Sequence, residues 1–221
     1  MERREHLRTA SVLSILGLML LAAAAALVLL SGGAASQERF EVFTGPAQYA
    51  AALSEAADYL RIVLALDDVY ILTYVGALCF AALGFRAANP AAALGAGLGA
   101  LAVGGLDFWE NMTMGTSLDV AMAGQTVDAG RIAYQAAISA AKWNGAAATL
   151  IALTFALPKE RFFEILLVWG TRLIFPAATA LFVTGALGLR QAGLYAIYAG
   201  MLSGFALLAI VTYNRSRDGV R

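Results

Sequence analysis

Long apolar runs separated by short polar segments dominate the pattern of this chain. Each run is long enough to cross a hydrocarbon core of about 30 Å as a helix that rises about 1.5 Å per residue. The pattern therefore predicts an all-α fold, a polytopic transmembrane bundle of six helices that forms a single integral membrane domain over residues 1–221. The predicted helices lie at about 10–31, 62–85, 90–114, 132–157, 162–187 and 192–213.

The first apolar run follows a charged N-terminal segment, so it fits either a cleaved signal peptide or a membrane anchor. It is longer than the apolar core of a signal peptide, which has about 7 to 15 residues. Ala34-Ala35-Ser36 nevertheless forms an acceptable cleavage site. We expect an uncleaved first helix, and removal of residues 1–36 is the alternative.

Residues 32–61 form a mixed polar segment that includes Glu38, Arg39 and Glu41. Gly45-Pro46 indicates a turn, and the Ala-rich stretch after it has helical composition, with the proline in its first turn. We expect an extracytoplasmic loop whose second half is a loop or an interfacial helix.

The distribution of basic residues predicts the orientation of the bundle. Basic residues are retained on the cytoplasmic side of membrane proteins. With the N-terminus in the cytoplasm, the outer segments contain only Arg39, Arg61, Arg131 and Arg190. The inner segments then contain Arg3, Arg4, Arg8, Arg86, Lys159, Arg161, Arg215, Arg217 and Arg221. Both termini are therefore predicted to be cytoplasmic, and we expect a multi-pass protein of the bacterial inner membrane.

Composition identifies the bilayer as the main partner and narrows the chemistry. The chain is 61% hydrophobic, 14% charged and has a formal net charge of zero, which gives no basis for nucleic-acid binding. It has one cysteine, Cys79, and one histidine, His6, which lies in the N-terminal segment. Cysteine metal clusters and bis-histidine haem ligation are thus excluded. Proton chemistry inside the membrane must use carboxylates, lysine, tyrosine or water.

Charged residues inside the apolar runs are the strongest functional signal. Asp68, Asp107 and Lys142 lie 18, 17 and 16 residues from the polar segments at the cytoplasmic ends of their runs. Regular helices place all three roughly 24 to 27 Å from that side. An ionised residue at the bilayer centre costs about 2.5 to 3.5 kcal/mol on insertion scales. We predict a polar layer in the outer half of the membrane that three helices share.

Helical periodicity selects the side chains that face this layer. Glu110 and Asn111 follow Asp107 by three and four residues, which places them on one helix face. Gln135, Ser139 and Lys142 likewise form one stripe on the run at 132–157.

The second run has two adjacent acids. Because neighbouring residues on a helix project about 100° apart, we expect Asp67 rather than Asp68 to face the layer. Tyr70 and Tyr74 share the face of Asp67. The candidate binding residues are Asp67, Asp68, Asp107, Glu110, Asn111 and Lys142, with Tyr70, Tyr74, Ser139 and Arg172 as secondary candidates.

The charges of these candidates do not balance, because they include four carboxyl groups but only two basic groups, Lys142 and Arg172. Buried like charges are resolved by protonation or by binding a cation. A proton, a cation with oxygen ligands or a cationic substrate therefore completes the predicted site. The identity of a cofactor and of any catalytic residue stays unknown, and no residue is assigned as a metal ligand.

Three functions agree with this pattern. The first is proton- or cation-coupled transport or binding of a small solute, for which a chain of this size would form a homo-oligomer. The second is a membrane enzyme acting on a lipid or isoprenoid-like substrate, with Trp109 and Trp143 stacking on it. The third is a non-catalytic subunit in which the polar residues only fix helix packing. Placement of the acids in the headgroup region is a further alternative.

Overall fold

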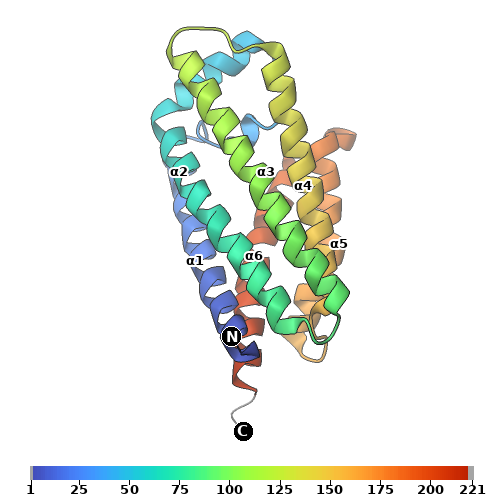
Figure 1. Cartoon of the computed structure of the whole chain (residues 1–221). Helices are drawn as coiled ribbons and strands as arrows, with labels where there is room; N and C mark the ends of the chain where they lie inside the picture. The colour runs from blue at the N-terminus through green and yellow to red at the C-terminus, as the bar shows by residue number, and fades with distance from the viewer. Residues whose placement is uncertain (1, 219–221) are drawn as a thin grey trace. The chain divides into compact units, whose positions relative to one another are not determined.

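The computed structural model describes residues 2–218, and these residues are almost entirely helical. Figure 1 shows the helices along the chain. The described part contains six long helices, α1 to α6, and two 3₁₀ turns, η1 and η2. In chain order they are α1 (Arg3–Leu30), η1 (Gln37–Arg39), α2 (Pro46–Phe85), α3 (Pro90–Met122), α4 (Ala129–Ala156), α5 (Phe162–Thr184), η2 (Ala186–Gly188) and α6 (Arg190–Arg217).

Five helices of the described part, α1, α2, α3, α5 and α6, are long and apolar enough to cross a membrane. The all-α, membrane-compatible character predicted from sequence is thereby confirmed. The fourth long helix, α4, is outside this set, and its middle contains Lys142 and Asn144. The count of six spans and the cytoplasmic termini stay predictions.

Helices α2 and α3 extend furthest beyond their predicted bounds, and α1 and α6 are each six residues longer than predicted. The segment after Pro46, expected as a loop or a separate interfacial helix, forms the first turns of α2, which has 40 residues. Its alanine-rich composition favours a helix, and no proline or glycine separates it from the apolar run. Helix α3 likewise continues beyond Met114 to Met122, and Gly124, with a φ of 72°, follows its end. The polar connections are correspondingly shorter than predicted.

The chain forms two compact units. Unit 1 comprises the described residues of Met1–Leu18, Leu72–Val103 and Trp143–Arg221. Unit 2 comprises Met19–Ile71 and Gly104–Lys142. The divisions fall within α1, α2, α3 and α4, so each of these helices contributes residues to both units. The predicted assignment of the whole chain to one membrane domain is not tested by this division.

Unit 1 is held together by close approach of its helices. The α5–α6 contact depends on Gly193, where a Cβ atom would lie 2.6 Å from the backbone nitrogen of Phe182. Trp143 and Phe182 pack edge to face with their ring centroids 5.9 Å apart. The Ser11 hydroxyl donates a hydrogen bond to the carbonyl of Ala209 over 3.0 Å, which joins α1 to α6.

Unit 2 has an apolar core that holds the connection between α1 and α2 in place. Gly32 and Gly33 adopt positive φ angles of 63° and 87° where the chain turns out of α1. Phe40 is 1% exposed and packs edge to face on Tyr49 of α2, with ring centroids 5.7 Å apart. This anchor fixes the residues on either side of Phe40, which include Gln37 and Glu41.

Candidate functional site

Lys142 lies at the centre of a group of buried acids in unit 2. Its Nζ atom is 3.0 Å from Oε1 of Glu41 and 3.0 Å from Oδ1 of Asp107, and it also contacts the carboxylate of Glu110. The side chains of Lys142, Glu41 and Glu110 are 9%, 3% and 1% exposed. One ammonium group thus has three carboxylate partners, contributed by α3 and by the connection between α1 and α2.

A second group of acids is organised by Asn111. Its Nδ2 atom donates hydrogen bonds to Oδ2 of Asp67 over 2.8 Å and to Oδ1 of Asp68 over 2.9 Å. Its Oδ1 atom accepts a hydrogen bond of 3.1 Å from Nε2 of Gln37. The expectation that only one of the two adjacent aspartates faces the site was wrong, because the two hydrogens of one amide group serve both carboxylates.

These two groups form one lysine–carboxylate cluster. Asp67 interacts electrostatically with both Asp107 and Lys142. We define the cluster as Glu41, Asp67, Asp68, Asp107, Glu110, Asn111 and Lys142. It contains five carboxyl groups and one amine, so it has a larger excess of acid than the sequence pattern alone indicated. Such an excess is neutralised by protons or by a bound cation.

Several polar side chains around the cluster are also buried. The Ser139 hydroxyl donates a hydrogen bond to Oε1 of Glu110. Tyr70, on the same helix as Asp67, is 5% exposed. Among the residues that the structure describes, no group of three or more His, Cys, Asp or Glu side chains has an arrangement suited to a metal ion.

Gln135 continues the stripe of Lys142 and Ser139 along α4. Residues four and seven apart on a helix share a face, so Gln135 lies on the side of α4 that contacts Glu110. Its side chain is completely buried, and within the described structure neither Nε2 nor Oε1 has a hydrogen-bonding partner. An unsatisfied buried polar group costs about 1 to 3 kcal/mol.

We expect Gln135→Met to raise the free energy of unfolding by about 1 to 3 kcal/mol, because methionine fills a similar volume without the unsatisfied amide. Thermal and denaturant unfolding in detergent would measure the change. Gln125→Met, at an exposed glutamine, is the matched control and should stay within about 0.5 kcal/mol of wild type. Destabilisation by Gln135→Met would instead show that the amide has a partner in the folded protein.

Two secondary candidates belong to unit 1 rather than to the cluster's unit. Tyr74 is 7% exposed there. Arg172 donates a hydrogen bond of 2.8 Å from Nε to the Thr154 hydroxyl, and its guanidinium lies 4.2 Å from the ring centroid of Phe155. Arg172 is therefore held by partners of its own on α4.

Gln37 and Glu41 are the cluster contacts that sequence reasoning missed. Both lie in the connection between α1 and α2, where no helical periodicity predicts the direction of a side chain. A sequence signal is Phe40, an apolar residue between Arg39 and Glu41, which indicates that this connection folds back onto a core.

No protein-family model matches the sequence, and no curated protein and no solved structure matches the chain. The class of protein is therefore described from its fold and its site. The chain is a helical, membrane-compatible protein with a buried lysine–carboxylate cluster.

Proposed function

We propose that the lysine–carboxylate cluster is the coupling site of a membrane protein that binds or transports a small solute with exchange of protons or cations. The observation that carries this proposal is the enclosure of one ammonium group by three buried carboxylates. Ionisable residues within membrane helices are rare and are usually functional, because their insertion is costly.

The chemistry of the cluster supports exchange. The Lys142 ammonium occupies a position that a monovalent cation or a protonated amine of the solute can replace. The two further carboxyl groups, Asp67 and Asp68, are held by Asn111 and supply additional proton-binding capacity. Binding of a cation to such a cluster releases protons, since the summed charge of closely spaced acids is limited in a medium of low dielectric constant.

Cation-driven proton movement is the direct test. The purified protein would be reconstituted in liposomes that contain a pH-sensitive dye, and the probes would be Na⁺, K⁺ and a set of small primary and quaternary amines. We expect at least one probe to drive proton movement in wild type. Asp107→Asn and Glu110→Gln should slow that movement by about tenfold or more, as for groups that take part directly.

Two further variants make the test specific. Asp119→Asn removes an exposed carboxylate of unit 2 that pairs with Arg61 over 2.7 Å, and it should leave the rate unchanged. Glu41→Gln alters the cluster from the connection between α1 and α2, outside the long helices, and should reduce the rate even if the α3 variants fold poorly. Equal rates in wild type and in folded cluster variants, or no response of wild type to any probe, would overturn the proposal.

The two tryptophans considered for stacking on a lipid substrate differ in exposure. Trp109 is 50% exposed and stays available for such stacking. Trp143 packs in the core of unit 1 against Phe182, and its side chain is 8% exposed. A lipid product that changes with the cluster variants, in the absence of proton movement, would favour the alternative of an enzyme acting on a lipid. Unchanged function in all folded variants would favour a packing role for the cluster.

A further inference from the structure

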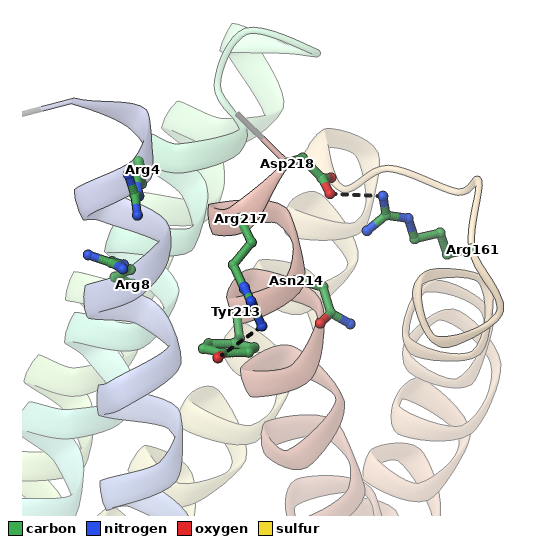
Figure 2. Close-up of a pocket in the computed structure, with 7 residues that line it drawn as sticks. All are labelled: Arg4, Arg8, Arg161, Tyr213, Asn214, Arg217 and Asp218. Atoms are coloured by element: carbon green, nitrogen blue, oxygen red, sulfur yellow. Dashed lines mark hydrogen bonds and ion pairs between the residues drawn. The ribbon is translucent and has the colours of Figure 1, made fainter. Parts of the chain in front are cut away.

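An open cleft of about 1040 Å³ lies in unit 1, where α1 begins and α6 ends beside the connection between α4 and α5. Figure 2 shows the side chains that line it. They are Arg4, Arg8, Arg161, Tyr213, Asn214, Arg217 and Asp218. Among the described residues, four guanidinium groups thus share the cleft with a single carboxylate.

The acids around the cleft are already engaged. Asp218 contacts Arg161 over 3.0 Å through one oxygen and Arg215 over 3.6 Å through the other. On α1, the Glu5 carboxylate accepts a hydrogen bond of 3.2 Å from the backbone nitrogen of Glu2. Within the described residues, the one carboxylate of the cleft therefore does not balance its four arginines.

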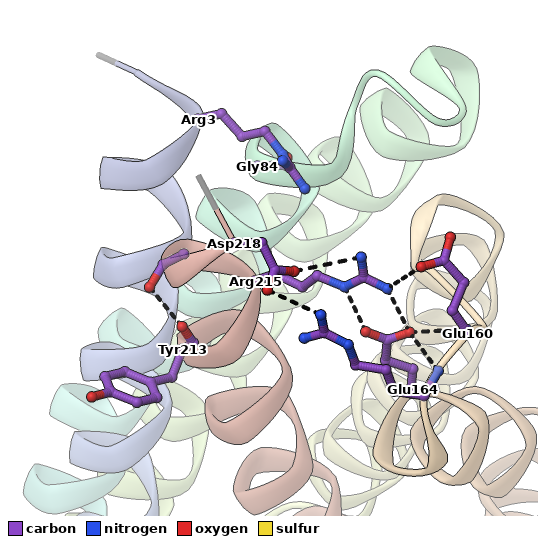
Figure 3. A network of polar contacts seen from close by, with 9 residues as sticks. Arg3, Gly84, Glu160, Glu164, Tyr213, Arg215 and Asp218 are labelled. Atoms are coloured by element: carbon purple, nitrogen blue, oxygen red, sulfur yellow. Dashed lines mark hydrogen bonds and ion pairs between the residues drawn. The ribbon is translucent and has the colours of Figure 1, made fainter. Parts of the chain in front are cut away.

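Two glutamates near the cleft, Glu160 and Glu164, are already paired with Arg215 (Figure 3). Nε of Arg215 lies 2.6 Å from Oε1 of Glu164, whose side chain is 2% exposed, and Nη2 lies 2.8 Å from Oε2 of Glu160. Glu164 also accepts hydrogen bonds from the backbone nitrogens of Glu160 and Arg161. These contacts bind the α4–α5 connection to the end of α6, and they occupy both glutamates with Arg215.

The arginines that line the cleft are left with unused charge. Among the residues that the structure describes, no carboxylate pairs with Arg4, Arg8 or Arg217. Arg4 and Arg8 are one turn apart on α1 and share a face. The Arg217 guanidinium lies 5.6 Å from the ring centroid of Tyr213 and donates a hydrogen bond of 3.4 Å to its hydroxyl. Planar guanidinium groups that line one cleft can bind phosphate oxygens through paired N–H donors.

The surface next to the cleft is suited to an acyl chain. On α1, Val12 and Ile15 follow Arg8 by four and seven residues, so they continue its stripe. They are 56% and 49% exposed, and the neighbouring Leu16 is 42% exposed. Exposed apolar residues along a candidate membrane helix face lipid tails, whereas basic pockets at helix ends bind anionic headgroups.

We infer that this cleft binds the phosphate group of an anionic phospholipid, with the headgroup at Arg4, Arg8 and Arg217 and an acyl chain along Val12 and Ile15. The charge of the cleft selects an anionic lipid over a zwitterionic one. The apolar stripe selects a lipid over a free phosphate compound. This inference is independent of the function proposed for the lysine–carboxylate cluster.

Native mass spectrometry of the purified protein in detergent tests the inference, with phosphatidylglycerol and phosphatidylcholine added at equal concentration. Wild type should retain phosphatidylglycerol in clear preference. Each arginine near a membrane surface contributes a factor of about five to the binding of an anionic lipid, so Arg4→Gln with Arg8→Gln should lower its affinity about 25-fold. Arg4 and Arg8 are both exposed, so folding should be preserved.

Arg86→Gln is the matched control, because Arg86 is an exposed arginine of unit 1 outside the cleft. Its lipid binding should equal that of wild type. Equal retention of phosphatidylglycerol by wild type and by the double variant would overturn the inference. Displacement of the lipid by inorganic phosphate at equal concentration would also overturn it and would assign the cleft to a soluble phosphate compound.

Discussion

Lys142→Met should destabilise the protein by about 3 to 5 kcal/mol, which is the usual consequence of removing one partner from a buried ion pair. The substitution leaves Glu41, Asp107 and Glu110 facing one another without the ammonium group that contacts all three. Methionine is unbranched and shorter than lysine only by the terminal Nζ atom, so most of the effect measures charge rather than a cavity. Denaturant unfolding in detergent, followed by tryptophan fluorescence, would record it.

A double variant separates charge from packing at the same position. Adding Glu110→Gln to Lys142→Met removes one unbalanced carboxylate and should recover part of the lost stability, because neighbouring charges are not additive in their effects. Lys159→Met is the matched control, since Lys159 is exposed, and it should change stability by less than about 0.5 kcal/mol. A loss in Lys142→Met no larger than in this control would show that the three contacts contribute little.

Asn111→Leu should cost about 3 kcal/mol, the second-largest effect that we expect. Asn111 donates to two carboxylates and accepts from Gln37, and hydrogen bonds to charged groups contribute about 1.5 to 3 kcal/mol each. Leucine has a similar volume but leaves the Asp67 and Asp68 oxygens without these donors. Unfolding in detergent would measure the loss of stability.

The same variant should loosen the connection between α1 and α2, since Gln37 loses a partner. Amide hydrogen exchange over residues 33–41 would then be faster than in wild type. Met112→Leu, at the adjacent and 57% exposed position of α3, should alter neither stability nor exchange. Unchanged exchange in a destabilised Asn111→Leu protein would mean that Phe40 alone anchors this connection.

Much of the fold could be predicted from the apolar runs. Several helix ends could also be predicted, because proline or charged residues mark them locally in the sequence. The predicted starts at 90 and 162 and the end at 85 agree with the helices α3, α5 and α2. The early start of α2 was missed because alanine is equally compatible with a short surface helix and with the first turns of a long one.

The site is predictable only where regular helices determine it. Depth along α3 and α4 related Asp107 to Lys142, and their atoms lie 3.0 Å apart. Glu41 reaches the same lysine from a non-helical connection, and its direction depends on the packing of Phe40 rather than on any repeat. Asp68 reaches Asn111 because side-chain torsions span the 100° that separates it from Asp67 on an ideal helix.

The length of α2 has a consequence for where this protein meets water. A helix of 40 residues measures roughly 60 Å, whereas the hydrocarbon core is about 30 Å thick. A tilt of about 60° would be needed to contain it, which exceeds the range of about 0 to 40° seen for membrane helices. If α2 crosses a membrane, part of it therefore projects beyond the hydrocarbon core. Charged side chains on its first turns, such as Glu55, Asp58 and Arg61, are exposed and suited to that environment. A crossing by α2 would thus leave its N-terminal part in water as a continuation of the same helix.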